Sequence, residues 1–166
     1  MTKKSSKRTL KISANLILNC LAFVLAVVSI FMIFAPALNV KGTLINDTYS
    51  GVHTTFGFID GDYVYLSFSF LNLLPYLLII FALVLLVLKM ANVIKAKYID
   101  YIIIALLVVA GVLFFLNTVM TNFSQSYANT INNFSLKKSM LTGPIVAGVL
   151  TLVSALTLLL NKFIKK

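Results

Sequence analysis

The chain has 166 residues, of which 60% are hydrophobic and 11% are charged, and its mean hydropathy is +1.02. A water-soluble domain of this length cannot bury so many apolar side chains and still keep a polar surface, so the lipid bilayer is its expected solvent. The formal net charge of +10 does not indicate nucleic acid, because the basic residues flank apolar runs and form no basic face with interleaved aromatic residues.

The first apolar run follows a basic N-terminal segment, residues 1–11. A membrane-spanning helix needs roughly 20 mainly apolar residues to cross about 30 Å of hydrocarbon, and residues 12–37 meet that requirement. Small and polar side chains recur along this run at alternating spacings of four and three, namely Asn15, Asn19, Ala22, Ala26 and Ser29. Small residues let membrane helices approach closely, so this stripe is a candidate helix-packing seam.

The same run also has features of a signal peptide, because a basic start and an apolar stretch are followed by Ala35, Pro36 and Ala37. Cleavage there would leave three spans and a mature N-terminus near Leu38. The apolar stretch is longer than the usual signal core of roughly 7–15 residues, so an uncleaved first span is the favoured interpretation. The mass of the purified protein distinguishes the two alternatives.

Residues 38–70 form the longest segment between apolar runs. From His53 onward the sequence predicts a β-hairpin that turns at Asp60-Gly61-Asp62, because Asp-Gly is a preferred hairpin dipeptide. Polar and apolar side chains alternate over residues 63–70, the pattern of a strand with one apolar face. Residues 40–45 are a candidate third strand. Five side chains of this loop are candidates for binding a partner: His53, Asp60, Asp62, Tyr63 and Tyr65.

The second and third apolar runs are expected to be membrane spans, at residues 71–88 and 99–120, with a short basic loop between them at residues 89–98. Residues 121–140 follow the third run, and four of their side chains have helical spacing: Phe123, Tyr127, Ile131 and Phe134. We therefore expect the third helix to project beyond the bilayer and to pack this aromatic stripe on the first loop.

A fourth span is expected at residues 141–160, before a basic C-terminal segment, residues 161–166. Small residues repeat every four positions along this span, namely Gly143, Ala147, Thr151 and Ala155, and they form a second candidate helix-packing seam. Ordinary packing within the bundle is the favoured interpretation of both seams. An interface with a partner protein is the alternative.

The basic residues also predict the orientation of the chain. Eleven of the 14 Lys and Arg residues lie in the N-terminal segment, the loop between the second and third runs, and the C-terminal segment, whereas the other two loops hold three. Basic residues are enriched in cytoplasmic loops, so both termini are expected in the cytoplasm. The chain is then a multi-pass protein of the plasma membrane, with residues 38–70 and 121–140 outside the cell.

Motifs that carry chemistry are missing from the sequence. The cores of the apolar runs hold no Asp, Glu, Lys, Arg or His, apart from Asp100 at the start of the third run, although intramembrane catalysis and ion coupling usually need such groups. His53 is the single histidine and Cys20 the single cysteine, so no two-histidine metal site is possible within one chain. We expect no enzyme activity, no cofactor and no metal. A loop metal or proton site that combines His53 with Asp47, Asp60 and Asp62 is the alternative.

The sequence Asp-Tyr-Val-Tyr-Leu-Ser-Phe-Ser-Phe-Leu-Asn-Leu-Leu-Pro, residues 62–75, resembles small, uncharacterised four-helix membrane proteins of low-GC Gram-positive bacteria and mycoplasmas. The resemblance covers the first two spans and their loop and implies no known activity. The arrangement of four helices with a large first outer loop is also similar to that of claudins. The Trp and paired Cys of the claudin loop are missing, because the chain has no Trp and one Cys.

The sequence thus predicts an all-α membrane protein, a four-helix transmembrane bundle with a small extracellular loop that contains a β-hairpin. We expect a non-enzymatic protein that acts through protein–protein interaction, as an accessory subunit or a homo-oligomer. The expected partners are the lipid bilayer and a membrane protein or a second copy of the chain. The alternative is a small channel or transporter component that uses uncharged polar residues.

Overall fold

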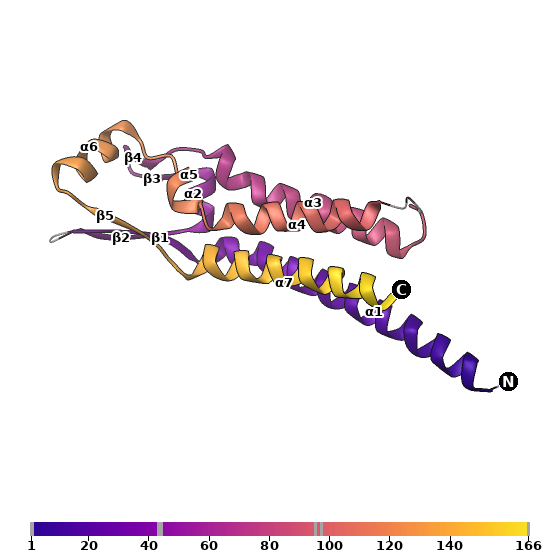
Figure 1. Ribbon diagram of the computed structural model, residues 1–166. Coiled ribbons are helices and arrows are strands. Elements are labelled where there is room, and N and C mark those ends of the chain that lie inside the picture. Colours follow the sequence, from indigo (N-terminus) through magenta and orange to yellow (C-terminus); the bar gives the residue numbers. More distant parts are fainter. Residues whose placement is uncertain (1, 43–44, 95, 97, 166) are drawn as a thin grey trace.

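The computed structural model describes the backbone of residues 2–42, 45–94, 96 and 98–165, and within these ranges the side chains from Asn15 to Phe163. The protein is mostly helical, and its long helices lie side by side while the strands and short helices gather at one end (Figure 1). The long helices are α1 (Thr2–Phe31), α3 (Phe70–Met90), α4 (Ile99–Phe114) and α7 (Thr142–Lys165).

Among the described residues, three helices are long and apolar enough to cross a membrane, namely Asn15–Phe34, Phe70–Met90 and Thr142–Phe163. The third apolar run is different from the continuous helix expected at residues 99–120. It forms α4, which has 16 residues and is therefore about 24 Å long, then a turn, and then the short helix α5 (Asn117–Met120). Three of the four expected spans are therefore present as helices of sufficient length.

The helices pack as a chain of neighbours, because α1 lies against α7, α7 against α4, and α4 against α3, with a smaller contact between α1 and α3. Their shared core is apolar and includes Ile79, Ile103 and Phe114, each at most 1% exposed. The outward faces are apolar as well, since Phe81 and Leu156 are more than half exposed. An apolar outer surface of this kind suits a lipid environment.

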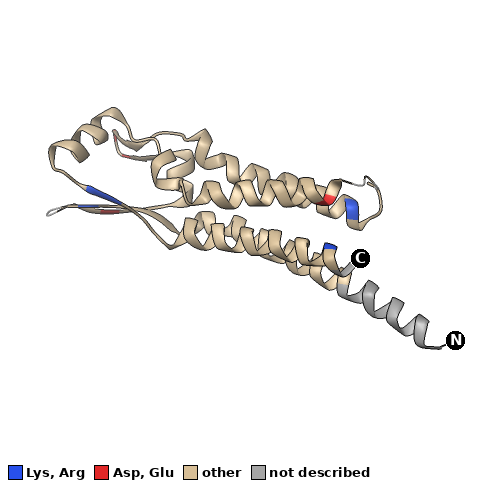
Figure 2. Cartoon of the chain, in the orientation of Figure 1, with Lys and Arg blue, Asp and Glu red and all other residues tan. Residues whose placement is uncertain are grey.

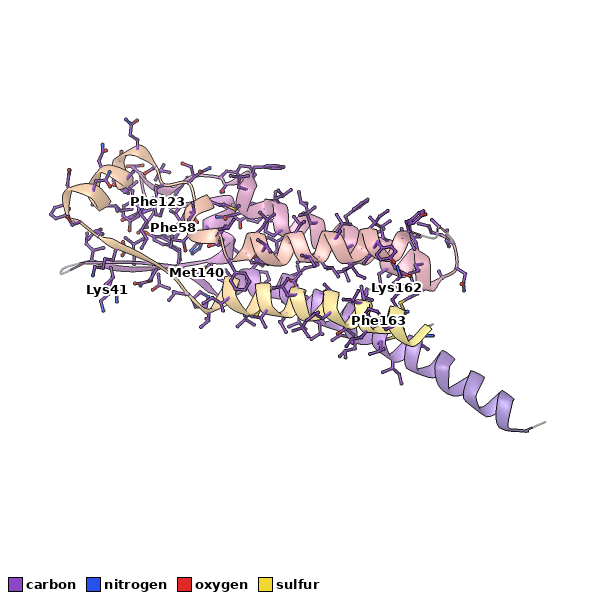
Figure 3. The ribbon with its side chains drawn as sticks, viewed as in Figure 1. Lys41, Phe58, Phe123, Met140, Lys162 and Phe163 are labelled. Carbon is purple, nitrogen blue, oxygen red and sulfur yellow. The ribbon has the colours of Figure 1, made fainter. Side chains whose placement is uncertain are left out.

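Charged side chains lie toward the two ends of this helix group, and its middle is free of them in the described part of the chain (Figure 2). Figure 3 shows Lys41 at the end that carries the strands and Lys162 at the opposite end. At that opposite end, Lys89 in the last turn of α3 forms an ion pair with Asp100 in the first turn of α4. The pair holds the two helices together beside the loop that joins them.

The strand-rich end contains a three-stranded antiparallel sheet with the order β2-β1-β5. Its strands are β1 (Pro36–Lys41), β2 (Asn46–Ser50) and β5 (Lys137–Met140). Leu38 pairs with Tyr49 on one side and with Met140 on the other. Strand β1 follows α1 after a short 3₁₀ helix, η1 (Met32–Phe34), so the last residues of the segment expected as the first span belong to this sheet.

The expected β-hairpin is present, but it is shorter than the sequence predicts. It pairs β3 (Phe58–Asp60) with β4 (Tyr63–Leu66), and Gly61 adopts a positive φ of 57° in its turn, which glycine tolerates without strain. Residues 53–56, expected in the first arm, belong instead to helix α2 (Gly51–Phe56), which the Ser50 hydroxyl caps by accepting from the His53 amide. Of the candidate third strand at residues 40–45, Val40 and Lys41 belong to β1 of the other sheet, Gly42 and Ile45 lie in the turn between β1 and β2, and residues 43–44 lie outside the described residues.

The second loop also differs from the expectation of one projecting helix. Residues 125–133 form a separate helix, α6 (Gln125–Asn133), and residues 137–140 form β5. The expected helical face is partly present, since Tyr127 and Ile131 are buried whereas Phe134 is exposed. A turn after α4 and the extended residues 121–124 allow α6 to lie over the sheet, away from the axis of α4.

Candidate functional site

The strands and short helices form a unit with its own hydrophobic core, which we call the cap (residues 36–69 and 121–141). Its buried core contains Leu38, Val40, Tyr49, Leu66, Tyr127, Ile131 and Leu136. These residues form a cluster separate from the core of the long helices. The cap is therefore a packed structure and not a set of loose loops, which is the property that a recognition surface needs.

Helix α6 is fixed onto the hairpin by several hydrogen bonds. The Ser124 amide donates to the Tyr65 carbonyl at 3.0 Å, and the Ser124 hydroxyl donates to the Val64 carbonyl. The same hydroxyl accepts from the Tyr127 amide at 3.2 Å and so caps the helix. These contacts set the position of Tyr127 relative to strand β4.

Aromatic rings fill the space between the sheet, the hairpin and α6. The ring centroids of Tyr65 and Tyr127 are 5.1 Å apart with the planes at 68°, and those of Tyr49 and Phe58 are 5.7 Å apart. Edge-to-face arrangements of this kind are favourable for aromatic pairs. His53 belongs to the same cluster, since its ring centroid lies 4.5 Å from that of Phe58.

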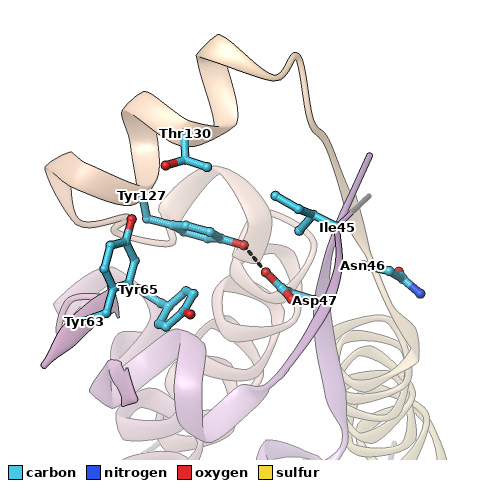
Figure 4. Close-up of a pocket in the computed structure, with 7 residues that line it drawn as sticks. All are labelled: Ile45, Asn46, Asp47, Tyr63, Tyr65, Tyr127 and Thr130. Carbon is cyan, nitrogen blue, oxygen red and sulfur yellow. Dashed lines mark hydrogen bonds between the residues drawn. The ribbon is translucent and has the colours of Figure 1, made fainter. Parts of the chain in front are cut away.

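A pocket of about 370 Å³ opens between β2, β4 and α6. It is lined by Ile45, Asn46, Asp47, Tyr63, Tyr65, Tyr127 and Thr130. Figure 4 shows the Tyr127 side chain reaching from α6 toward β2, where its hydroxyl donates to Asp47 Oδ2 at 2.7 Å. Among these lining residues Asp47 carries the only charge, and three of the others are tyrosines.

The two buried phenols next to the carboxylate are held in their protonated form. Burial raises the pKa of the Tyr127 phenol well above its usual range, and hydrogen bonds with Tyr49 and Asp47 act in the same direction. Burial also raises the pKa of Tyr49. Tyr127 therefore remains a hydrogen-bond donor, and the Asp47 carboxylate is its acceptor.

We expect the free energy of unfolding to fall as the pH rises above about 10, the ordinary pKa of tyrosine. In that range the unfolded chain releases protons that the folded chain retains on Tyr49 and Tyr127, so alkaline pH favours unfolding. The substitution Tyr127→Phe should flatten this dependence and should also lower stability at neutral pH by about 1 kcal/mol, because its hydrogen bond to Asp47 is lost. Unfolding of the detergent-solubilised protein at neutral and alkaline pH measures both effects. A steeper alkaline decline in the variant would contradict the prediction.

The structure places the loop residues singled out from the sequence in three different settings. Tyr63 and Tyr65 line the pocket, whereas Asp60 and Asp62 lie exposed at the hairpin turn. His53 lies in the aromatic cluster, and its Nδ1 has no hydrogen-bond partner within the described part of the chain. No group of three or more His, Cys, Asp or Glu side chains among the described residues is placed to hold a metal ion.

Five of the seven pocket residues were not among the candidates for binding a partner, namely Ile45, Asn46, Asp47, Tyr127 and Thr130, although Asp47 was part of the alternative metal or proton site. Tyr127 was visible as part of a helical stripe, and Asp47 as one of the few acids of the loops. The sequence contains no signal that joins them, because Tyr127 and Asp47 are 80 positions apart. Their contact depends on the way in which α6 packs over the sheet.

The two candidate helix-packing seams meet each other within the chain. On α1, Asn19, Ala22, Ala26 and Ser29 are buried and Asn15 is partly exposed, and on α7 the buried residues are Gly143, Ala147, Thr151 and Ala155. The Ser154 hydroxyl donates to the Ala22 carbonyl at 2.7 Å. Asn161 Nδ2 donates to Asn19 Oδ1 at 2.7 Å and to the Asn15 carbonyl at 3.3 Å. These hydrogen bonds join α1 to α7 between residues 15–22 and 154–161.

A buried polar cluster joins the cap to the long helices. Asn72 Nδ2, in the first turn of α3, donates to the Thr54 carbonyl at 2.9 Å and to Thr121 Oγ1 at 3.0 Å. The Ser69 hydroxyl donates to the Met120 carbonyl at 2.6 Å, and the Ser69 amide donates to the Thr55 carbonyl at 2.9 Å. We call these residues the cap base, because they fix α2 and the ends of α5 and α3 to one another.

Comparison with known proteins adds no assignment to this geometry: no family model matches the sequence, and no curated protein matches it at a significant level. The fold and the site define a mostly helical protein with three helices able to cross a membrane and a small β-containing cap at one end. The functional argument therefore depends on the site itself.

Proposed function

We propose that this chain is a non-enzymatic integral membrane protein that acts by binding, with the cap as its recognition surface. It would work as an accessory subunit of a membrane complex or as a homo-oligomer. The observation that carries this proposal is the cap itself, which has its own buried core and a tyrosine-lined pocket. A rigid, concave surface of this kind is a common feature of binding sites.

The proposed topology has four spans with both termini in the cytoplasm and the cap outside the cell. In support, the chain termini and the loop between α3 and α4 lie at the end opposite the cap (Figure 1). Eleven of the 14 Lys and Arg residues belong to these segments, as expected for the cytoplasmic side. The third span would consist of α4 together with α5, since residues 99–120 extend over about 33 Å if helical.

The two helix-packing seams pack against each other within the chain, and this supports the cap as the recognition surface. Ala22, Ala26 and Ala147 are each at most 1% exposed, so the small-residue stripes on α1 and α7 are already occupied. Asn19 and Asn161 are hydrogen-bonded to each other, which is the usual role of asparagine between membrane helices. The same contacts favour packing over the alternative of a pore lined by uncharged polar residues.

Site-specific photocrosslinking in intact cells tests the proposal. A photoreactive residue is placed at Ile59, which is 62% exposed on the hairpin, and a matched one at Phe81, which is 54% exposed on the membrane face of α3. We expect position 59 to give a protein adduct of one defined mass, either a second copy or a stoichiometric membrane partner. Position 81 should give mainly lipid adducts. Protein adducts from position 81 alone, or none from either position, would overturn the proposal.

A further inference from the structure

We propose that the cap pocket binds a soluble organic cation through a substituted ammonium group. This inference adds a small ligand to the proposed binding role and does not depend on it. Its basis is the composition of the pocket, in which one carboxylate, that of Asp47, faces three tyrosine rings, those of Tyr63, Tyr65 and Tyr127 (Figure 4). No charge of the opposite sign lies among the residues that line it.

The carboxylate and the tyrosine rings of the pocket both favour a positively charged ligand. The face of an aromatic ring carries negative potential and attracts ammonium groups, and cages of such rings recognise substituted ammonium ions. Asp47 adds a full negative charge, and one of its oxygens, Oδ2, accepts from Tyr127. Each carboxylate oxygen can accept more than one contact, so the carboxylate can face a ligand while Tyr127 holds it in place.

A contact between an ammonium group and an aromatic ring already exists within the protein, next to the pocket. Lys138 Nζ lies 4.4 Å from the centroid of the Phe123 ring, and the Phe123 ring centroid is 6.1 Å from that of Tyr127. Lys138 pairs with Val40, which pairs with Asp47 on its other side. The backbones of Lys138 and Asp47 are therefore two strand spacings apart, or about 10 Å, and the Lys138 ammonium lies over the Phe123 ring, which is not among the residues that line the pocket.

The volume and position of the pocket favour a small, soluble ligand over a lipid headgroup. A volume of about 370 Å³ is at the lower end of the range for small-molecule sites, roughly 300–1,000 Å³. Asp47 lies three residues along β2 from Ser50, which pairs with Pro36 just after the 3₁₀ helix η1. This separation corresponds to about 10 Å of strand, which places the pocket at the part of the cap that is remote from the long helices.

Calorimetric titration of the full-length protein in phosphatidylglycerol nanodiscs tests the proposal, with choline and tetramethylammonium as probes. We expect both probes to bind, and we expect no binding of the neutral isostere of choline in which a tert-butyl group replaces the trimethylammonium group. The substitution Asp47→Asn should weaken binding about tenfold, because it removes the charge but keeps an oxygen that accepts from Tyr127. Tyr63→Leu should weaken binding as well, whereas Tyr63→Phe, which keeps the ring, should not.

The matched control is Asp62→Asn, which removes the same charge from the cap at the exposed hairpin turn, outside the pocket. Unchanged binding in this variant supports the pocket, and an equal loss would assign the effect to the net charge of the cap. Equal binding of the neutral isostere, or full binding by Asp47→Asn, would overturn the proposal. If the probes bind more weakly in phosphatidylcholine nanodiscs, the choline headgroups of the lipid compete for the pocket. That result would assign the site to a lipid headgroup and would overturn the proposal of a soluble ligand.

Discussion

The substitution Gly111→Val is expected to lower the free energy of unfolding by about 3 kcal/mol, the upper part of the usual range for overpacking. Gly111 on α4 faces Gly148 on α7 at a point where the two backbones are in contact. A Cβ added at Gly111 would lie 2.8 Å from Cγ and Cδ2 of Leu152 and 3.3 Å from the Gly148 carbonyl oxygen. A Cβ added at Gly148 would in turn lie 3.1 Å from the Gly111 carbonyl oxygen. A larger side chain must therefore separate the helices, and van der Waals packing is the main attraction between helices in lipid.

Ala105→Val on the same helix is the matched control, because residue 105 is exposed on the outward face. It adds a β-branched side chain to α4 without entering the contact with α7, and its effect should be within about 0.5 kcal/mol. Unfolding of both variants in detergent, followed by far-ultraviolet circular dichroism, makes the comparison. Equal stabilities for the two variants would show that α4 and α7 do not touch at Gly111.

The positions of the long helices follow from the sequence because hydropathy dominates their formation. A long apolar run in lipid must satisfy its own backbone hydrogen bonds, and the helix does so within one segment. The expected second span at residues 71–88 therefore closely matches α3 (Phe70–Met90), and the fourth, expected at residues 141–160, corresponds to α7 (Thr142–Lys165). The interruption at residues 115–116 was not predictable, because these residues continue the apolar run.

Only those strands of the cap that have a sequence pattern within a short stretch of the chain could be predicted. Asp60 and Gly61 specify a turn, and the alternation after it places Tyr63 and Tyr65 on one face of β4, so the hairpin could be predicted. Strand β5 could not, because Lys137–Met140 has no apolar alternation and forms by pairing with residues nearly 100 positions away. Residues 51–56 have β-favouring side chains, yet the Ser50 cap and the burial of Thr54 and Thr55 favour a helix.

Two of the seven residues that line the pocket were binding candidates in the sequence. Alternation along β4 contributes Tyr63 and Tyr65, which were candidates, whereas the opposite wall comes from β2 and α6. Its central contact joins Asp47 to Tyr127, and this contact requires both the sheet register and the docking of α6. Such long-range packing is not encoded in any short window of sequence, so the sequence could name Asp47 as a loop carboxylate but could not pair it with Tyr127.

The substitution Asn72→Ala is expected to destabilise the cap base by about 2 kcal/mol and to loosen the cap before the helices. Asn72 is 1% exposed, and its side chain donates to both the Thr54 carbonyl and Thr121 Oγ1. Alanine would leave two buried acceptors without that donor, and a buried polar group that loses its partner costs about 1–3 kcal/mol. Hydrogen–deuterium exchange should accelerate in residues 51–69 and 117–122 and change little in α7.

Asn122→Ala is the matched control, because it removes an asparagine hydrogen bond of the cap that is not buried. Asn122 Nδ2 also donates to a backbone carbonyl, that of Phe68 at 2.9 Å, but this bond is exposed, so water replaces the lost donor and the expected cost is below about 1 kcal/mol. If the two variants exchange at equal rates, the cap is not held by its buried polar cluster. A selective effect of Asn72→Ala would instead mean that the geometry of the pocket depends on a hydrogen-bonded anchor at the end of the long helices. The cap would then be joined to the long helices through Thr54 and Thr121, so that a ligand bound in the proposed site would be in contact with a structure that is fixed to the helix ends.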